Sequence, residues 1–251
     1  MAEPTVELLA YSPDPERVVA VAARRSYSRH PAKELWDELG DEEVSELLYR
    51  VIRQRHLSVL EHVHFTFAVE GVSRALSHQL VRHRIASYTQ QSQQRASEQH
   101  FEFVVPPEIE DDPVLVREFQ ETMNNLGTAY QRMLDKGVKK GLARYVLPNA
   151  CTTKLIMTMN ARSLFNLISQ RICGVEEWEF RTVATKIHEV LMTVAPNIFK
   201  YAGPPCVTEL VCYEGENGER CGRYRMIPGA VLRNGFRKTT GDELLKHSKT
   251  C

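Results

Sequence analysis

The stretch "RHRIASYTQQSQQR", which runs from Arg82 to Arg95, decides which fold and chemistry the chain is expected to have. It concentrates arginine, histidine and glutamine in a short span with few apolar side chains. Arginine offers a planar fork of N–H donors that suits phosphates and imide edges, and glutamine offers both a donor and an acceptor. Two interpretations fit this pattern alone: an exposed basic loop, and a site that holds anions and a base edge.

The composition argues against several classes of protein. The 251 residues carry 32 basic and 32 acidic side chains, so the whole chain has no net charge with which to hold nucleic acid or an anionic membrane. No apolar run approaches about 18 residues, the length that suggests a membrane span. The start "MAEPTVELLA" lacks the layout of a signal peptide. We therefore expect a cytoplasmic protein whose six cysteines are reduced.

Outward from the opening stretch, helical and strand patterns interleave without a regular βαβ series. This favours an α+β fold with a mixed sheet flanked by helices. We predict strands within 5–12, 63–71, 101–107 and 152–161, and helices within 16–25, 41–54, 72–83, 113–136, 161–172 and 176–196. After Tyr201, glycine, proline, cysteine and charges dominate, so we divide the chain into a main domain, 1–201, and an irregular C-terminal tail, 202–251.

Two helix starts are predicted from capping residues. Asp14 followed by Pro15 should begin the first helix. In "HLSVLEH", which runs from His56 to His62, Ser58 and Glu61 have the spacing of a capping box. The two histidines of this motif lack acidic or cysteine partners at ligand spacing, so we expect no metal there.

Further polar motifs lie downstream. "NARSLFNLISQR" places Arg162 and Asn166 four residues apart, on one face of a predicted helix that begins near Asn160 and ends at Arg171. "ARYVLP" supplies Arg144. There is no Gly-rich phosphate loop of either common kind, so side chains would have to hold any nucleotide phosphates.

Taken together, and in their order along the chain ("HLSVLEH", "RHRIASYTQQSQQR", "ARYVLP", "NARSLFNLISQR"), the four motifs resemble those of the flavin-dependent thymidylate synthases, and the resemblance covers most of the chain. It implies an enzyme that methylates dUMP to dTMP, with methylenetetrahydrofolate as carbon donor and NADPH as reductant through bound FAD. It also implies a homotetramer whose active sites are shared between subunits, with no nucleic-acid or membrane partner.

Carried over position by position, the resemblance implies a role for each polar motif. Flavin contacts fall on Ser26, Ser58, Glu61, Arg82, His83, Arg84, Ile85, Gln90, Asn160, Arg162 and Asn166. The dUMP site falls on Gln79, Arg82, Gln90, Ser92, Gln94, Arg95, Arg144 and Arg171. Arg171 and His56 are the candidate catalytic residues.

The chain departs from the family pattern at three positions. Two glutamines stand between Ser92 and Arg95 where many relatives have one residue, so either Gln94 or Arg95 binds the phosphate. Val175 replaces a histidine that contacts flavin in many relatives. Gln90 stands where relatives often carry glutamate, and an amide cannot take up a proton.

Two alternatives stay open from the residues themselves. A nucleic-acid-binding module would use the Arg/Gln stretch, but it would need aromatic platforms, and only Tyr88 is available. In the tail, Cys206, Cys212 and Cys221 are not spaced as Cys-x-x-Cys pairs. We therefore expect a tail that packs on the core or on a neighbouring subunit, with a structural zinc site as the alternative.

Overall fold

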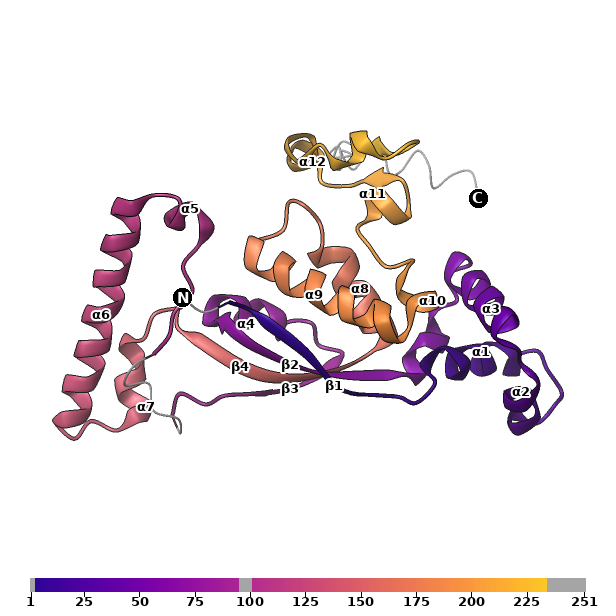
Figure 1. Ribbon diagram of the computed structural model, residues 1–251, viewed down its shortest axis with the longest axis horizontal. Coiled ribbons are helices and arrows are strands. Elements are labelled where there is room, and N and C mark those ends of the chain that lie inside the picture. The colour runs from indigo at the N-terminus through magenta and orange to yellow at the C-terminus, as the bar shows by residue number, and fades with distance from the viewer. Residues whose placement is uncertain (1–2, 95–100, 234–251) are drawn as a thin grey trace, which may run out of the picture.

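A four-stranded sheet forms the centre of the molecule, which is a computed structural model that describes residues 3–94 and 101–233 (Figure 1). Its strands are β1 (Thr5–Tyr11), β2 (His64–Ser73), β4 (Thr152–Asn160) and β3 (Ala86–Gln90), in that spatial order. Every neighbouring pair is antiparallel. The α+β class is confirmed, whereas the prediction that this sheet is mixed is wrong.

The sheet buries one face and exposes much of the other. Along β4, Leu155, Met157 and Met159 are buried, whereas Lys154 and Ile156, which alternate with them, are exposed. Successive side chains of a strand point to opposite faces, so this alternation marks which face carries the core. In the part of the chain that the structure describes, no helix covers the opposite face (Figure 1).

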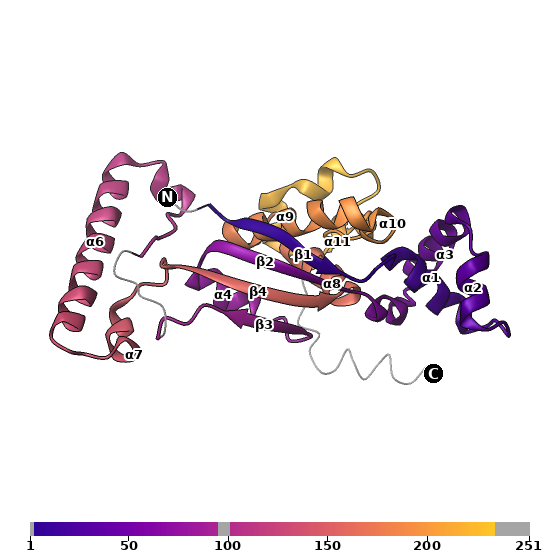
Figure 2. The same cartoon turned by 60° about the horizontal axis from the view of Figure 1, so that its bottom comes forward.

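Helices cover the buried face and extend both ends of the molecule (Figures 1 and 2). α8 (Ala161–Arg171) and α9 (Trp178–Val194) lie over the sheet, and α4 (Arg74–Leu80) adds buried leucines to the same core. The remaining helices of the main domain are α1 (Pro15–Arg25), α2 (Ala32–Glu38) and α3 (Asp41–Arg53) at one end, α5 (Pro107–Glu110), α6 (Pro113–Asp135), α7 (Lys140–Ala143) and the 3₁₀ turn η2 (Arg144–Val146) at the other, and α10 (Pro196–Phe199).

A buried carboxyl group joins α4 to α9. Ser73 caps α4 by accepting a hydrogen bond from Leu76 N, and its own N–H and Oγ–H donate to Glu179 at 2.6 and 2.5 Å. Burial raises the pKa of Glu179, although the two bonds from Ser73 act the other way. Through this contact α9 fixes where α4 begins, and therefore where the stretch after α4 emerges.

Several elements differ from their predictions. The strand predicted within 101–107 is reduced to one isolated bridge between Phe103 and Cys151. α2 was missed, and β3 lies inside the stretch that was treated as a loop. β3 was not predicted because its sequence lacks the alternation of polar and apolar residues that marks a strand. It is an edge strand in which the outward-facing Ser87 and Thr89 alternate with half-buried residues.

The predicted helix start at Asp14 and Pro15 is confirmed, although no side chain caps it, and the predicted capping box is wrong. Asp14 takes a left-handed conformation, with φ of 43°, and its side chain makes no capping bond. Ser58 and Glu61 lie inside a 3₁₀ helix, η1 (Leu57–His62), and form no capping box. Glu61 is used instead in an ion pair with Arg162 of α8. A 3₁₀ turn aligns side chains differently from an α-helix, so the spacing alone could not establish the box.

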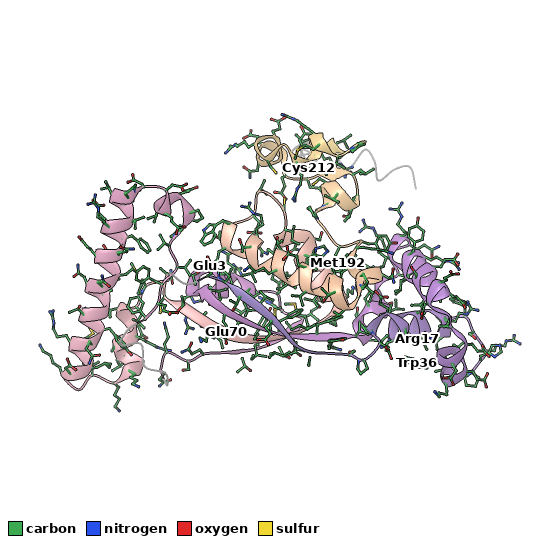
Figure 3. All side chains as sticks on the ribbon, viewed as in Figure 1. Glu3, Arg17, Trp36, Glu70, Met192 and Cys212 are labelled. Atoms are coloured by element: carbon green, nitrogen blue, oxygen red, sulfur yellow. The ribbon has the colours of Figure 1, made fainter. Side chains whose placement is uncertain are left out.

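The described part of the tail holds more regular structure than predicted. It contains α11 (Pro205–Thr208), β5 (Val211–Cys212), α12 (Gly215–Cys221), η3 (Arg223–Met226) and β6 (Val231–Leu232). The two strands form a small parallel pair. Figure 3 shows this segment, marked by Cys212, beyond α8 and α9 and away from the sheet. None of the helices described is long and apolar enough to cross a membrane.

Candidate functional site

A cavity of about 1050 Å³ lies where the turn after α4 faces α8. Four parts of the chain form its walls: the turn from Arg82 to Ile85, the exposed side of α8, the segment 52–61, and residues 200–209 at the start of the tail. Ligand cavities commonly measure about 300–1000 Å³. This cavity is therefore large enough for an extended ligand such as a dinucleotide.

Tyr88 of β3 holds the turn in place. The backbone N–H groups of Arg82 and His83 donate to Gln79 O and Leu80 O, both at 3.1 Å. The Tyr88 hydroxyl donates to the carbonyls of Leu80 and His83 at 2.8 and 3.0 Å, and burial raises its pKa. Because its side chain packs against the hydrophobic core, Tyr88 does not offer the exposed stacking platform that the nucleic-acid hypothesis needed.

Helix α8 supplies the opposite wall. Asn160 caps it by accepting a hydrogen bond from Ser163 N at 2.8 Å, which confirms the predicted junction between strand and helix. Arg162 and Asn166 follow on one exposed face and both line the cavity. Arg162 is paired with Glu61, so this pair joins η1 to α8 along the cavity wall.

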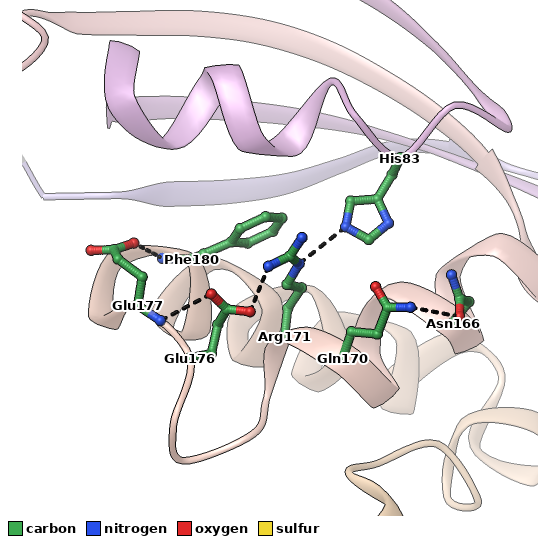
Figure 4. Close-up of polar contacts among 7 residues, drawn as sticks. All are labelled: His83, Asn166, Gln170, Arg171, Glu176, Glu177 and Phe180. Atoms are coloured by element: carbon green, nitrogen blue, oxygen red, sulfur yellow. Dashed lines mark hydrogen bonds and ion pairs between the residues drawn. The ribbon is translucent and has the colours of Figure 1, made fainter. Parts of the chain in front are cut away.

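Arg171, the last residue of α8, is the most constrained cation in the cavity (Figure 4). Its Nε donates to His83 Nε2 at 3.2 Å, and its Nη1 donates to Glu176 at 2.5 Å. The guanidinium lies over the ring of Phe180, 4.5 Å from the centroid. Its Nη2 makes no hydrogen bond within the described residues, so this side of the fork remains for a ligand.

His83 is held in its neutral form by this arrangement. Burial lowers the pKa of His83, and the charge of Arg171 lowers it further, while Glu176 opposes the shift. The ring accepts a bond at Nε2, so its proton is assigned to Nδ1. His83 also meets Phe180 edge-on, with centroids 5.8 Å apart. Protonation of His83 at Nε2 would therefore break its hydrogen bond with Arg171, which joins the Arg82–Ile85 turn to α8.

The cavity is strongly cationic. Its basic side chains are Arg53, Arg55, Arg82, Arg84, Arg162, Arg171 and Lys200, and its acidic ones are Glu61 and Glu209. Glu61 and Glu209 are both occupied, since Glu209 pairs with Arg55 at 2.6 Å. Low-dielectric walls lined by one sign of charge concentrate ligands of the opposite sign. The chemistry of this lining suits a ligand with several phosphate charges.

The structure brings half of the predicted site residues together. Those that line the cavity are Glu61, Arg82, His83, Arg84, Ile85, Asn160, Arg162, Asn166 and Arg171. Those that do not are Ser26, His56, Ser58, Gln79, Gln90, Ser92, Gln94 and Arg144, and Arg95 lies outside the described residues. Ser26 ends α1, where its hydroxyl donates to Ala23 O. His56 and Ser58 are exposed on the neighbouring turn, near the cavity but not lining it.

A second polar group, which we call the far-end cluster, comprises Gln90, Ser92, Gln94 and Arg144. Gln90 donates to Thr153 Oγ1 at 3.1 Å, and Ser92 Oγ accepts from Gln94 N at 3.3 Å. The Gln94 side chain packs on α7, where a Cβ added at Gly141 would lie 3.2 Å from it. Arg144 follows α7 directly and is exposed. β3 separates this cluster from the cavity, since its four steps span about 13 Å at about 3.3 Å per residue.

Several cavity residues were missed by sequence analysis. Arg53, Arg55, Lys200 and Glu209 come from segments that carry no recognised motif, and Phe165 lies within the motif 160–171 but was not assigned a role. Arg55 is a non-glycine residue with a positive φ of 58°, an uncommon conformation that turns the chain into the cavity wall. The basic run before His56 was the one signal available in the sequence for the first two.

Comparison with known proteins gives a consistent result. The family model described as "Thymidylate synthase complementing protein" matches residues 7–197. A protein of Clostridium tetani named "Flavin-dependent thymidylate synthase" is 45% identical over 218 residues, which cover 80% of this chain and 88% of that protein. Proteins with the same name from Geobacter sulfurreducens and Thermococcus kodakarensis are 44% and 40% identical, and cover 87% and 92% of this chain and 94% of each relative.

Proposed function

The chain belongs to the thymidylate synthase complementing protein family, and on this premise we propose that it methylates dUMP to dTMP in the cytoplasm. Methylenetetrahydrofolate would give the carbon, NADPH would give the reducing equivalents, and FAD would be the bound cofactor. The observation that carries the proposal is the cationic cavity between the Arg82–Ile85 turn and α8. We assign this chemistry to residues 1–201, with the start of the tail as one wall.

The residues present fit FAD. Its pyrophosphate needs fixed cations or N–H donors, and the chain has no Gly-rich loop, so Arg82, Arg84 and Arg162 would hold it. Its flat ring needs apolar surface with polar groups at the edge. Phe165 offers apolar surface, and Asn166 offers donors and acceptors on the same helix. When bound, FAD supplies hydride transfer, which no protein side chain provides.

Arg171 would act on the uracil. C5 of uracil is a weak nucleophile until electron density enters from the N3–C4–O4 edge. A fixed guanidinium beside this edge stabilises charge that develops there, most strongly in a partly dry site. Contacts with His83, Glu176 and Phe180 hold Arg171 in one orientation, so no rearrangement is needed when the charge appears.

The far-end cluster would bind the nucleotide, and it would do so for a neighbouring subunit. Gln90, Ser92, Gln94 and Arg144 offer amide, hydroxyl and guanidinium groups suited to a base edge and a phosphate. Within one chain they lie at the other end of β3 from Arg171. We therefore propose a homotetramer in which the cavity of one subunit faces the far-end cluster of another.

Between the two candidates for the phosphate, we propose Arg95. The side chain of Gln94 packs on Gly141, and its amide is neutral. Arginine is permanently charged and binds two phosphate oxygens at once. At Val175 we propose that no side chain replaces the histidine contact with flavin. Arg53, Arg55 and Lys200 would instead supply additional cations to the flavin cofactor.

The direct test is product formation. The purified chain is incubated with dUMP, methylenetetrahydrofolate, NADPH and FAD, and dTMP is measured by chromatography, with one component omitted in each control. We expect a yellow protein after gel filtration, and dTMP only in the complete mixture. A protein that retains FAD but forms no dTMP would contradict the reaction, and a protein that stays colourless would contradict the cavity assignment.

A further inference from the structure

The described part of the tail has almost no apolar core of its own. From 205 to 233 the buried residues are Cys206, Cys212 and Gly218, whereas Leu210 and Val231 are exposed. Its strands have two residues each, and its longest helix has seven. A unit this small rarely folds on hydrophobic burial alone and usually needs disulfides, a metal or docking to a larger body. Something other than apolar packing must therefore hold this segment in shape.

Cysteines occupy the inner positions of the tail, and a further one meets them from the main domain. Cys206 lies in α11, Cys212 in β5 and Cys221 at the end of α12, and Cys173 lies in the loop after α8. All four are free thiols. The approach is close: a Cβ added at Gly174 would lie 2.5 Å from Cys221 Sγ.

A second glycine makes room for a second sulfur. A Cβ at Gly218 would lie 2.6 Å from Cys212 Sγ, a distance that real Cβ atoms do not show. Gly222, directly after Cys221, has a φ of +68°, so a side chain there would be strained. Glycines thus stand where the backbone must pass close to a sulfur or turn sharply beside one.

Burial disfavours the thiolate form of two of these cysteines. It raises the pKa of Cys173, while a hydrogen bond from the backbone of Val175 opposes the shift and Glu214, Cys221 and Cys212 raise it further. Burial likewise raises the pKa of Cys206, with added contributions from Cys173, Cys212 and Cys221, while Arg223 opposes the shift.

We propose that one Zn²⁺ ion joins the tail to the end of α8 through four thiolates: those of Cys173, Cys206, Cys212 and Cys221. Four cysteine sulfurs are a common ligand set of structural zinc, and soft thiolates select zinc over magnesium or calcium. Among the residues described, no three potential ligand groups already lie at coordinating spacing. The side chains must therefore turn inward as the thiols lose their protons to solvent and bind the ion.

The spacing of the tail cysteines did not indicate this site, because one of the four proposed zinc ligands lies outside the tail. Three tail cysteines stand without Cys-x-x-Cys pairs, and the fourth ligand comes from the main domain, more than 30 residues earlier. Arg223 already joins the same two segments by donating to Ile172 O at 3.2 Å. The ion would thus fix the part of the tail whose Val207 and Glu209 line the cavity.

The test begins with the full-length protein and no substitution. The chain is expressed in medium with added Zn²⁺ and purified without chelator, and metal content is measured by atomic emission. We expect about one Zn²⁺ per chain. An organomercurial that titrates thiols should release this ion to a metal-sensitive dye. A zinc content no higher than that of the buffer, or thiols that all react without releasing zinc, would overturn the proposal. Disulfides among these cysteines, found by mass spectrometry under non-reducing conditions, would overturn it as well.

Substitutions then assign the ligands. Cys173→Ser and Cys221→Ser should each lose most of the bound zinc, whereas Cys151→Ser, which removes a buried thiol outside the group, should keep it. Circular dichroism and flavin content establish that each variant remains folded. Equal zinc content in all three folded variants would overturn the ligand assignment. Neither readout depends on thymidylate formation, so failure here is distinct from failure of the proposed reaction.

Discussion

The two ends of β3 differ in how far the surrounding chain encloses the polar residues there. At the Ala86 end, the Arg82–Ile85 turn, α8, the segment 52–61 and the tail enclose a cavity on several sides. At the Gln90 end, Gln94 packs against α7, but Ser92 and Arg144 are exposed. Leu142 and Tyr145 beside them are 63% and 82% exposed.

This difference motivates the proposal that one chain carries parts of two different sites. Under that proposal the cavity would hold a cofactor, and the far-end cluster, which has no wall opposite it among the described residues, would hold a nucleotide. The two would then serve one reaction when subunits associate. Each substitution below therefore should affect one end and leave the other unchanged.

The largest effect is expected from Arg171→Lys at the cavity end. Lysine keeps the charge but cannot reproduce the fork that bonds His83 and Glu176 together. The turnover number should fall by about a hundred-fold or more, the scale seen when a preorganised electrostatic group is lost. Steady-state dTMP formation and flavin occupancy are measured together, and FAD should remain bound.

The matched control is Arg117→Lys on α6, which lies outside the cavity and bonds only to its own helix. It should keep the parental turnover number. If Arg171→Lys stays near the parental rate with full flavin, Arg171 is merely a cation at the C-terminal end of a helix, where the helix dipole favours it.

A smaller effect is expected from Arg144→Ala at the far end. Loss of a charge-assisted hydrogen bond costs about 1.5–3 kcal/mol, so dUMP affinity should weaken by about ten- to a hundred-fold. Calorimetry measures the affinity, and absorbance measures flavin content, which should not change. Lys139→Ala removes a nearby exposed charge and is the control. Equal losses in both variants would mean that general charge, rather than a specific contact, attracts the nucleotide.

The smallest effect is a pH dependence at the cavity end. The pKa of His83 is lowered below its ordinary 6.5 by burial and Arg171. Between 6.5 and this lowered value, the unfolded chain binds a proton that the folded chain does not. The free energy of unfolding should therefore fall as pH drops below 6.5, and level off below the folded pKa.

Denaturant titrations across this range test the prediction with His83→Gln as the comparison. The glutamine can still accept a bond from Arg171 but cannot take up a proton. The difference in unfolding free energy between the two proteins should change with pH only below 6.5. A difference that stays constant would show that His83 titrates alike in the folded and unfolded states.

The sequence predicted the parts of the molecule that local pattern determines. The long helices, β1, β2 and β4 have clear periodicity, and Asn160 caps α8 as its position suggested. The four polar motifs also contain the polar residues that the fold places at the two ends of β3. What they could not show is that β3 itself is a strand that separates them, because a polar edge strand has no apolar stripe.

Contacts between distant segments account for the remaining misses. Lys200 and Glu209 reach the cavity only because the chain returns over α8. Ser58 and Glu61 matched a capping box, but tertiary pairing of Glu61 with Arg162 prevailed over that local bond. Cys173 gained its relation to the tail cysteines in the same way. In each case the sequence holds the residue types, and the fold decides which of them meet.

Complementation between variants tests most directly whether active sites are shared. Arg82→Ala, at the cavity end, and Arg144→Ala, at the far end, are co-expressed with different tags and purified as mixed oligomers. If each site joins the cavity of one subunit to the far-end cluster of another, random mixing leaves about one site in four intact. At a dUMP concentration well below the Kd of the Arg144→Ala variant, where each variant alone forms little dTMP, we expect roughly a quarter of the parental dTMP formation.

The control is a mixture of Arg82→Ala with Arg171→Lys, both at the cavity end. Every cavity in that mixture carries one substitution, so activity should stay at the level of the separate variants. The same result from the Arg82→Ala and Arg144→Ala mixture, in oligomers shown by both tags to be mixed, would contradict the shared site and place the whole reaction within one chain.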